Sequence, residues 1–362
     1  MPNRSQIQAR AAMMRVRFEA AGAQVVDTPL LQPAETLLDL YGEDIRARAY
    51  VTSDALRGEQ MLRPDFTMPV VQMHMHDGAE PARYTYSGEV FRRQEHDPDR
   101  ANEYIQVGYE VFDREDPSGA DAEVFSLFAL QLRGLPLRAA TGDIGILIAA
   151  VQGLRTTERR KMALMRHLWR PRRFRILLER FAGRKATSEV RTELLDASDP
   201  MAFDAPMIGK RRASEIVARI DALREDRDTP PISDNEMAGL ESLLAVRETM
   251  PFALEQLRDV AVDLPQITPA LDRLEARIAA LQARGVDVDT LDFEASYGRT
   301  SMEYYDGFVF GFYAEGRPDL PPVATGGRYD ALTRQLGEGA EIPAVGGVIR
   351  PDLMLEIEED AQ

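Results

Sequence analysis

The chain has 362 residues, of which 44% are hydrophobic and 29% charged, which is enough apolar sequence for two or three domains or one large domain with an insertion. Its formal charge of −16 argues against a general nucleic-acid or anionic-membrane binder, because phosphate groups would be repelled. The absence of cysteine excludes disulfides, thiol catalysis and cysteine-ligated metals, and no two of the four histidines have helical i, i+4 spacing. The sequence therefore predicts no metal site and no cofactor.

Neither a transmembrane segment nor a secretion signal is indicated. No run of about eighteen apolar residues occurs, and the first residues lead directly into an amphipathic pattern without the apolar core of a signal peptide. We expect a cytoplasmic protein that does not enter the membrane.

The first elements alternate between helix and strand. Apolar spacing predicts a helix over Ser5–Ala21 with Ser5 as its N-cap, followed by a short strand at Gln24–Thr28. A second helix is expected from Thr67 to about His76. Helical periodicity returns at Asp121–Leu132.

The strongest strand signal is a hairpin. Two aromatic, β-rich segments, Tyr84–Arg92 and Tyr104–Phe112, are separated by eleven mostly polar residues, which predicts antiparallel strands joined by a long loop. The second strand alternates, so that one face carries Ile105, Val107, Tyr109 and Val111, and the other carries Tyr104, Gln106, Gly108, Glu110 and Phe112.

The remainder of the chain divides into a helical part and a second sheet-forming part. From about residue 153 to 263 the strand signal disappears and helical spacing dominates. A helix at Ile267–Arg284 precedes strands expected at Val286–Phe293, Tyr304–Tyr313, Pro322–Thr325 and Ala344–Ile349. This order predicts an α+β fold in which a sheet-based core, residues 1–152 and 265–362, is interrupted by a mostly helical insertion, residues 153–264.

Polar residues on the hairpin form the first candidate site. Gln106 and Glu110 lie on the same face of their strand with Gly108 between them, and an amide and a carboxylate beside a gap suit a ligand ammonium. The alternative is a solvated sheet face. Arg92 ends the first strand of the hairpin and Arg100 lies in the loop. Both could bind phosphate or carboxylate, or they could be ordinary surface residues.

Two further segments are open to more than one interpretation. Thr325–Asp330 contains two glycines that form either a structural turn or an anion-binding helix start. The stretch Arg155–Lys185 holds twelve basic and two acidic residues, with interleaved aromatic side chains. It is either a patch for nucleic acid or an acidic partner, or a solvated helical face.

Several of these segments occur in an order that resembles class II aminoacyl-tRNA synthetases in their histidyl form. The hairpin segments Arg83–Arg92 and Gln106–Phe112 resemble motif 2, and the Arg-Pro-Asp-Phe-Thr sequence at 63–67 resembles the family's Arg-Pro-Glu-Gly-Thr. Met302–Phe310 is similar to the family's histidine-pocket segment, and Val25–Leu31 is similar to motif 1. Gly326–Leu332 and Pro343–Ile349 are similar to the segments that lead to motif 3.

The resemblance implies an antiparallel sheet flanked by helices and a homodimer formed through motif 1. It also implies that an amino-acid pocket is kept in outline. The histidine-binding residues that it implies in this chain are Asp65, Thr67, Arg92, Arg100, Gln106, Glu110, Tyr304 and Tyr305.

The departures from the synthetase pattern concern ATP. Leu353 stands where motif 3 has the arginine that grips ATP, Arg350 replaces a small glycine, and Thr300 replaces the activating arginine beside Arg299. In the loop, Arg-x-Glu-Arg-Pro becomes Arg-Arg-Gln-Glu-His at 92–96. The sequence also stops soon after motif 3, so that no anticodon-binding domain is expected. Loss of these cations should abolish activation, because they stabilise charge on the transferring phosphate.

The sequence keeps an amino-acid pocket but lacks an ATP site. In this combination it resembles the regulatory subunits of ATP phosphoribosyltransferase. That family implies a noncatalytic chain in a hetero-oligomer with the short-form catalytic subunit, needed for the first step of histidine biosynthesis, and feedback inhibition by histidine as effector. Two alternatives remain: a degenerate synthetase-like enzyme that still activates histidine, and a scaffold whose pocket is vestigial.

Overall fold

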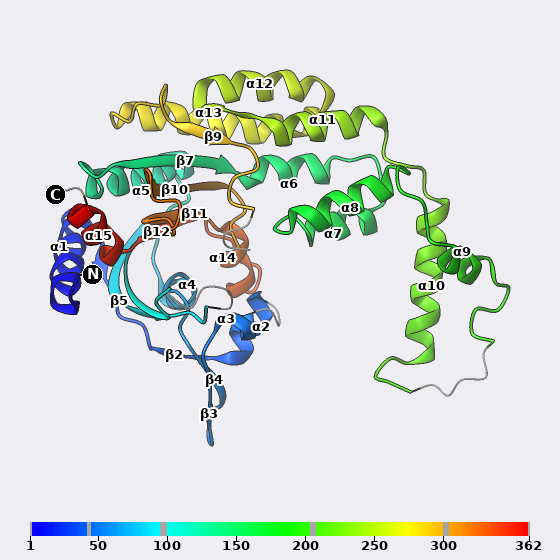
Figure 1. Ribbon diagram of the computed structural model, residues 1–362, viewed down its shortest axis with the longest axis horizontal. Helices are drawn as coiled ribbons and strands as arrows, with labels where there is room; N and C mark the ends of the chain where they lie inside the picture. The colour runs from blue at the N-terminus through cyan, green and yellow to red at the C-terminus, as the bar shows by residue number, and fades with distance from the viewer. Residues whose placement is uncertain (1, 42–44, 95–99, 203–207, 300–303, 361–362) are drawn as a thin grey trace.

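A computed structural model describes residues 2–41, 45–94, 100–202, 208–299 and 304–360 (Figure 1). Its centre is a nine-stranded sheet with the order β1-β5-β6-β12-β11-β10-β7-β9-β8. The strands of this sheet are β1 (Gln24–Val25), β5 (Ala82–Phe91), β6 (Glu103–Phe112), β7 (Leu137–Asp143), β8 (Arg247–Thr249), β9 (Asp292–Glu294), β10 (Phe308–Ala314), β11 (Ala324–Arg328) and β12 (Ala344–Ile349). Neighbours from β5 to β7 in this order pair antiparallel, whereas the β1–β5 and β7–β9 pairs are parallel. The α+β prediction is confirmed, with an antiparallel centre and mixed edges.

A second, three-stranded sheet lies below the first in Figure 1, in the order β2-β4-β3. Its strands are β2 (Leu31–Pro33), β3 (Val51–Asp54) and β4 (Gly58–Leu62). It packs with helix α2 (Ala34–Tyr41) and a short helix α3 (Ile45–Arg48) around a small core of its own.

Helices cover both faces of the large sheet (Figure 1). The larger core gathers residues of α1, α5, α6, α11–α13 and α15 on one face, and the smaller core gathers residues of α4 and α14 on the other. The helices named here are α1 (Arg4–Ala20), α4 (Thr67–Asp77), α5 (Pro117–Gln131), α6 (Ile144–Gln152), α11 (Asp234–Ala245), α12 (Met250–Asp263), α13 (Thr268–Ala283, preceded by a 3₁₀ turn at Pro265–Ile267), α14 (Asp330–Leu336) and α15 (Pro351–Asp360).

The predicted alternation of β6 is confirmed, and both of its faces are buried. Ile105, Val107, Tyr109 and Val111 belong to the larger core, while Tyr104 and Phe112 belong to the smaller one. The solvated-face interpretation of this strand is therefore wrong: Gln106 is 2% exposed and Glu110 is completely buried.

Several boundaries differ from those expected from sequence. The N-cap of α1 is Asn3, which forms a capping box with Gln6, because its side chain accepts from the Gln6 amide while Gln6 bonds back to the Asn3 amide. Strand β1 ends at Val25 and β9 begins only at Asp292, because each pairs with its neighbour over only two residues.

The glycine pair Gly326–Gly327 lies inside β11 and not in a turn. These residues pair with Gly347 and Gly346 of β12, so both the turn and the helix-start interpretations of the segment are wrong. Helix α14 begins only after it, at Asp330. Glycines are needed here because a Cβ on Gly326 would lie 2.5 Å from the Gly346 carbonyl oxygen.

The elements between residues 153 and 264 are mainly helical, and the division of the chain into core and insertion stays a prediction. Besides α11 and α12 they comprise α7 (Glu158–Met165), α8 (Pro171–Phe181), α9 (Glu189–Asp196) and α10 (Ala213–Asp228). Sequence analysis missed the strand β8 in this region, because its three residues are too few for a periodic signal, and it also missed β2, β3, β4 and β7 in the rest of the chain. Helices α9 and α10 project from the rest as an arm (Figure 1). None of the helices that the structure describes could cross a membrane.

Candidate functional site

The candidate site is centred on the carboxylate of Glu110. Its Oε1 atom accepts hydrogen bonds from Thr67 Oγ1 at 2.9 Å and from the Tyr86 hydroxyl at 2.7 Å, and its Oε2 atom accepts from the Tyr329 hydroxyl at 2.6 Å. Burial raises the pKa of Glu110 to about 7, although these three donors favour the charged form. Since a carboxylate has about four acceptor positions, one remains on Oε2 for a ligand donor.

Two glycines make room for this arrangement. A Cβ on Gly108 would lie 2.1 Å from Cζ of Tyr86, and a Cβ on Gly346 would lie 1.5 Å from Oε2 of Glu110. The space beside Gly108 is thus filled by the Tyr86 ring and is not the ligand gap expected from sequence. Gly346, on the neighbouring strand, is the glycine that accommodates the carboxylate.

The segment before α4 supplies two more of the predicted residues. Asp65 and Thr67 are both buried, and the charge of Asp65 helps to raise the pKa of Glu110. Arg63 holds this segment in place: its guanidinium donates to the Glu89 and Thr28 carbonyl oxygens at 2.9 and 2.5 Å. Asp65 and Thr67 therefore face Glu110 from a fixed backbone.

Stacked side chains connect Arg63 to Tyr86, which bonds to the carboxylate of Glu110. The Arg63 guanidinium lies 3.8 Å from the Phe66 ring centre, and Phe66 stacks on Tyr86 at 4.3 Å. Because Tyr86 donates to Glu110, the Arg-Pro-Asp-Phe-Thr motif acts largely by positioning the tyrosine.

Gln106 lies on the same face of β6 as Glu110, four residues before it, with Gly108 between them. Its Oε1 atom is buried and accepts no hydrogen bond from any described residue. A buried acceptor without a donor is costly, so this atom favours a ligand that brings an N–H group.

The tyrosine pair and Arg92 complete the group. Tyr305 is buried, and its ring centre lies 4.8 Å from that of Tyr304, which is in turn 6.2 Å from Tyr329. Burial raises the pKa of Tyr305; Glu110 and Asp65 add to this effect, whereas the positive charge of Arg92 opposes it. Arg92 also donates Nε–H to the Pro64 carbonyl at 2.8 Å, so it lies beside the site.

Seven of the eight predicted histidine-binding residues are thus near one another or on one face, and Arg100 is the exception. Its side chain is exposed in the hairpin loop, whereas the other seven are buried or half-buried. Sequence analysis missed Tyr86 and Tyr329. Tyr86 could have been found from the hairpin register, which pairs it with Gly108, and Tyr329 from the Gly-Gly-Arg-Tyr sequence.

The described residues at which the sequence departs from the ATP-binding pattern of the synthetases make other contacts. Leu353 is buried in the larger core, and the Arg350 guanidinium lies 4.0 Å from the Tyr104 ring centre and pairs with Asp352 at 2.6 Å. Arg299 points away from Glu110: it donates Nε–H to the Leu168 carbonyl at 2.9 Å and lies over Phe174. Thr300, and the loop residues Glu95 and His96, lie outside the described residues.

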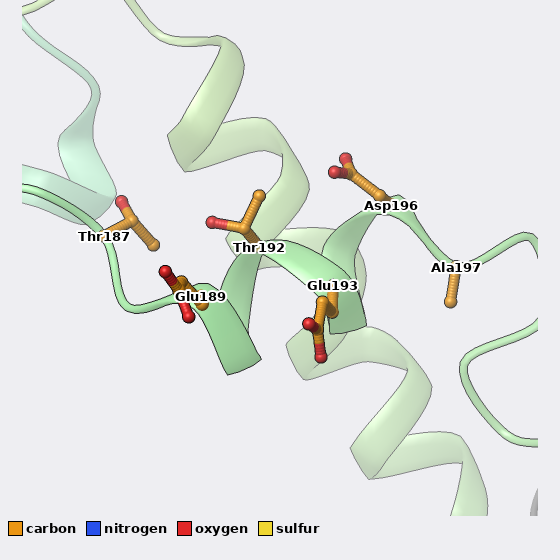
Figure 2. Close-up of a pocket in the computed structure, with 6 residues that line it drawn as sticks. All are labelled: Thr187, Glu189, Thr192, Glu193, Asp196 and Ala197. Carbon is orange, nitrogen blue, oxygen red and sulfur yellow. The ribbon is translucent and has the colours of Figure 1, made fainter.

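A surface hollow on α9 is unrelated to this site. Figure 2 shows the side chains that line it, among them the carboxylates of Glu189, Glu193 and Asp196. None of the predicted site residues contributes to it, and its acidic lining does not suit the carboxylate of an amino acid.

Acceptors predominate around Glu110. The site contains the carboxylates of Glu110 and Asp65 and the unpartnered Gln106 oxygen, and the positive charge of Arg92 acts on the same group. Such a site suits a small ligand that carries an ammonium group and a further N–H donor.

Comparison with known proteins gives consistent results at the level of family. A family model described as histidyl-tRNA synthetase matches residues 2–229 and 210–353. Two curated relatives named ATP phosphoribosyltransferase regulatory subunit, from Mesorhizobium japonicum and Agrobacterium fabrum, are 31% and 32% identical to the chain. The first comparison covers 99% of each chain and the second 91%.

Solved structures show the same fold. A regulatory subunit/histidyl-tRNA synthetase from Bacillus halodurans superimposes with a TM-score of 0.67 at 21% identity, over 98% of this chain and 79% of that one. The histidyl-tRNA synthetase of Nostoc gives a TM-score of 0.63 at 16% identity, over 98% and 72%. At these identities the similarity concerns the fold.

Proposed function

The chain belongs to the family of ATP phosphoribosyltransferase regulatory subunits, which have the histidyl-tRNA synthetase fold, and on that premise we propose that it binds histidine at the Glu110 site. As a noncatalytic regulatory subunit it would act in the first step of histidine biosynthesis, the condensation of ATP with phosphoribosyl pyrophosphate. Bound histidine would then signal feedback inhibition to a short-form catalytic subunit.

The proposal rests on two buried acceptor atoms of the site that can each accept a hydrogen bond from a ligand. Glu110 has one open acceptor position and Gln106 an unused oxygen, and the α-ammonium and imidazole N–H of histidine are the kinds of donor that would satisfy them. Arg92 would balance the ligand carboxylate. The buried position of Leu353 and the pairing of Arg350 with Asp352 leave neither side chain to bind a triphosphate.

We also propose that the chain forms a homodimer through its motif 1 region. Large apolar side chains are exposed on α1 and on the segment that follows it, which includes β1 at the edge of the large sheet. These are Met13, Val16, Val25, Leu30 and Leu31. Such a group of exposed apolar side chains favours contact with another subunit.

Reconstitution tests the function directly. Mixing the chain with its short-form catalytic subunit should raise phosphoribosyltransferase activity, and histidine should then inhibit the mixture. For feedback, histidine must bind one state of the complex better than the other, and a coupling of about 1–3 kcal/mol suffices. A stable mixture without either effect would refute the proposal, and histidine-dependent ATP–pyrophosphate exchange would favour the degenerate-enzyme alternative.

A further inference from the structure

The basic stretch noted in the sequence folds into the helical hairpin α7–α8, whose two sides differ. Leu164, Leu168, Phe174, Leu178 and Phe181 are buried and belong to the larger core. The inner side of the hairpin is therefore fixed to the body of the protein. Most of its arginines lie on the outer side, whereas Arg160 is buried and pairs with Asp226.

The outer side combines arginines with exposed apolar groups. On α7 the residues Arg159, Met162 and Arg166 follow one another at helical spacing, and α8 continues with arginines around Ile176. Met162 and Ile176 are 59% and 48% exposed. We call this surface the basic face; its residues are Arg159, Met162, Arg166, Arg172, Arg173, Arg175 and Ile176.

Little negative charge balances the basic face. Arg159 and Arg175 form only long surface pairs, with Glu225 at 3.5 Å and Glu179 at 3.4 Å. Within the described residues, no ion pair involves Arg166, Arg172 or Arg173. Burial and the nearby charges of Arg170, Arg173 and Arg166 lower the pKa of His167, which shows how closely these cations gather.

The aromatic residues of the stretch do not favour nucleic acid. Phe174 and Phe181 are buried at 1% and 4% exposure, and Trp169 packs against the larger core, so none is presented for stacking on a base. Exposed methionine and isoleucine among arginines are instead typical of protein–protein interfaces.

We propose that the basic face docks an acidic, partly apolar surface of the catalytic subunit. This inference rests on the proposed regulatory function, which requires such a partner. The arginines supply positive charge for an acidic surface of the partner, and Met162 and Ile176 supply apolar contact.

Arg299 contacts the connection between the two helices that carry the basic face. This buried residue belongs to the segment that leads to Tyr304, and its Nε–H bonds to the Leu168 carbonyl in the α7–α8 connection. Its guanidinium also lies over the ring of Phe174, 4.8 Å from the centre. Arg299 therefore fastens the α7–α8 hairpin to the chain segment that carries this arginine.

The test is charge reversal of the complete chain. We would combine Arg166→Glu with Arg173→Glu and compare it with Arg133→Glu plus Arg273→Glu, a matched control of two exposed arginines outside the basic face. The double reversal should weaken binding to the catalytic subunit by about tenfold or more, equivalent to about 1.4 kcal/mol, while the control stays near wild type. Wild-type affinity should also fall as ionic strength rises from about 0.05 to about 0.5 M.

Unchanged thermal unfolding and histidine affinity would show that the double reversal is folded. If the wild-type chain binds the subunit and the folded double reversal binds it equally well, the docking proposal is wrong and the proposed function stands. If the wild-type chain forms no complex, both proposals fail. Binding of tRNA that the reversal abolishes, with the subunit complex intact, would identify a nucleic-acid surface and overturn the docking proposal.

Discussion

The hydroxyl of Tyr329 donates a hydrogen bond of 2.6 Å to Oε2 of Glu110, although the two residues are 219 positions apart in the chain. Glu110 lies on β6 and Tyr329 directly follows β11, so this contact crosses the intervening strand β12. Gly346 of β12 permits it, because any side chain there would collide with the carboxylate. The candidate site thus exists only when the two distant parts of the core form one sheet.

The charge of Glu110 should be needed for histidine binding. Glu110→Gln keeps the shape of the side chain but removes the counter-charge for the ligand ammonium. We expect histidine affinity to fall by about tenfold or more, since hydrogen bonds to charged groups contribute about 1.5–3 kcal/mol. Titration calorimetry measures this, with Glu103→Gln, an exposed position on the same strand, as the control. Equal affinities in the two variants would contradict the assignment of the pocket.

Glu110 should also make stability depend on pH. Its folded-state pKa of about 7 is above the ordinary value of 4.5, so the folded chain binds more protons than the unfolded chain between these values. Its stabilising contribution is complete below about pH 4.5 and is lost as pH rises through 7. Asp306, whose pKa burial likewise raises to about 7, changes stability in the same direction.

The measurement is chemical denaturation between pH 5 and pH 7. Each group contributes a slope of up to about 1.36 kcal/mol per pH unit to the free energy of unfolding. Glu110→Gln should remove the share of Glu110 and leave that of Asp306, so that the slope becomes shallower. An unchanged slope would show that Glu110 titrates normally.

Tyr329→Phe should destabilise the protein without enlarging or filling the site. The change removes one of three donors to a buried carboxylate, which should cost about 1–3 kcal/mol in the free energy of unfolding. Tyr313→Phe, which removes a hydroxyl contact with Tyr297 away from Glu110, is the matched control for loss of a tyrosine hydroxyl. If only the control lowers stability, the Tyr329–Glu110 contact contributes nothing.

A buried ionic network holds the sheet to its helices, and Asp121 is its centre. Asp121 on α5 pairs with Arg328 of β11 at 2.6 Å and with Arg277 of α13 at 2.8 Å, and Arg277 also pairs with Asp143 at 2.9 Å. All four side chains are nearly inaccessible to solvent. The network therefore fixes the backbone on one side of Tyr329, which follows Arg328.

Asp121→Ala should cost about 3–5 kcal/mol, because it leaves two buried guanidinium groups with reduced compensation. The control is Glu275→Ala, which breaks an exposed pair with Arg258 and should cost less than about 1 kcal/mol. Urea denaturation of both variants decides the matter. Similar small losses would mean that the network is not a determinant of stability.

Local pattern sufficed where one element's own residues decide its structure. The alternation of β6 identified both of its faces, and the antiparallel hairpin of β5 and β6 followed from two β-rich segments. Patterns failed at short elements such as β8 and β9, which have three residues each and depend on neighbours supplied by the rest of the chain. They also failed at β7, a strand of seven residues that pairs with β10 and β9. Gly326 and Gly327 were interpreted as a turn or a helix start because the sequence does not show that they pair with Gly347 and Gly346 of the next strand.

The sequence by itself determined the segment order, the family resemblance and most of the residues that gather around Glu110, because these depend on residue type and spacing along the chain. Only the tertiary structure decided that Tyr86 fills the space beside Gly108, that Tyr329 completes the carboxylate cluster and that Arg299 faces the α7–α8 hairpin. These contacts depend on which strands become neighbours and on how much water their packing excludes. Burial of that kind, which also raises the pKa of Glu110, is a property of the folded chain as a whole.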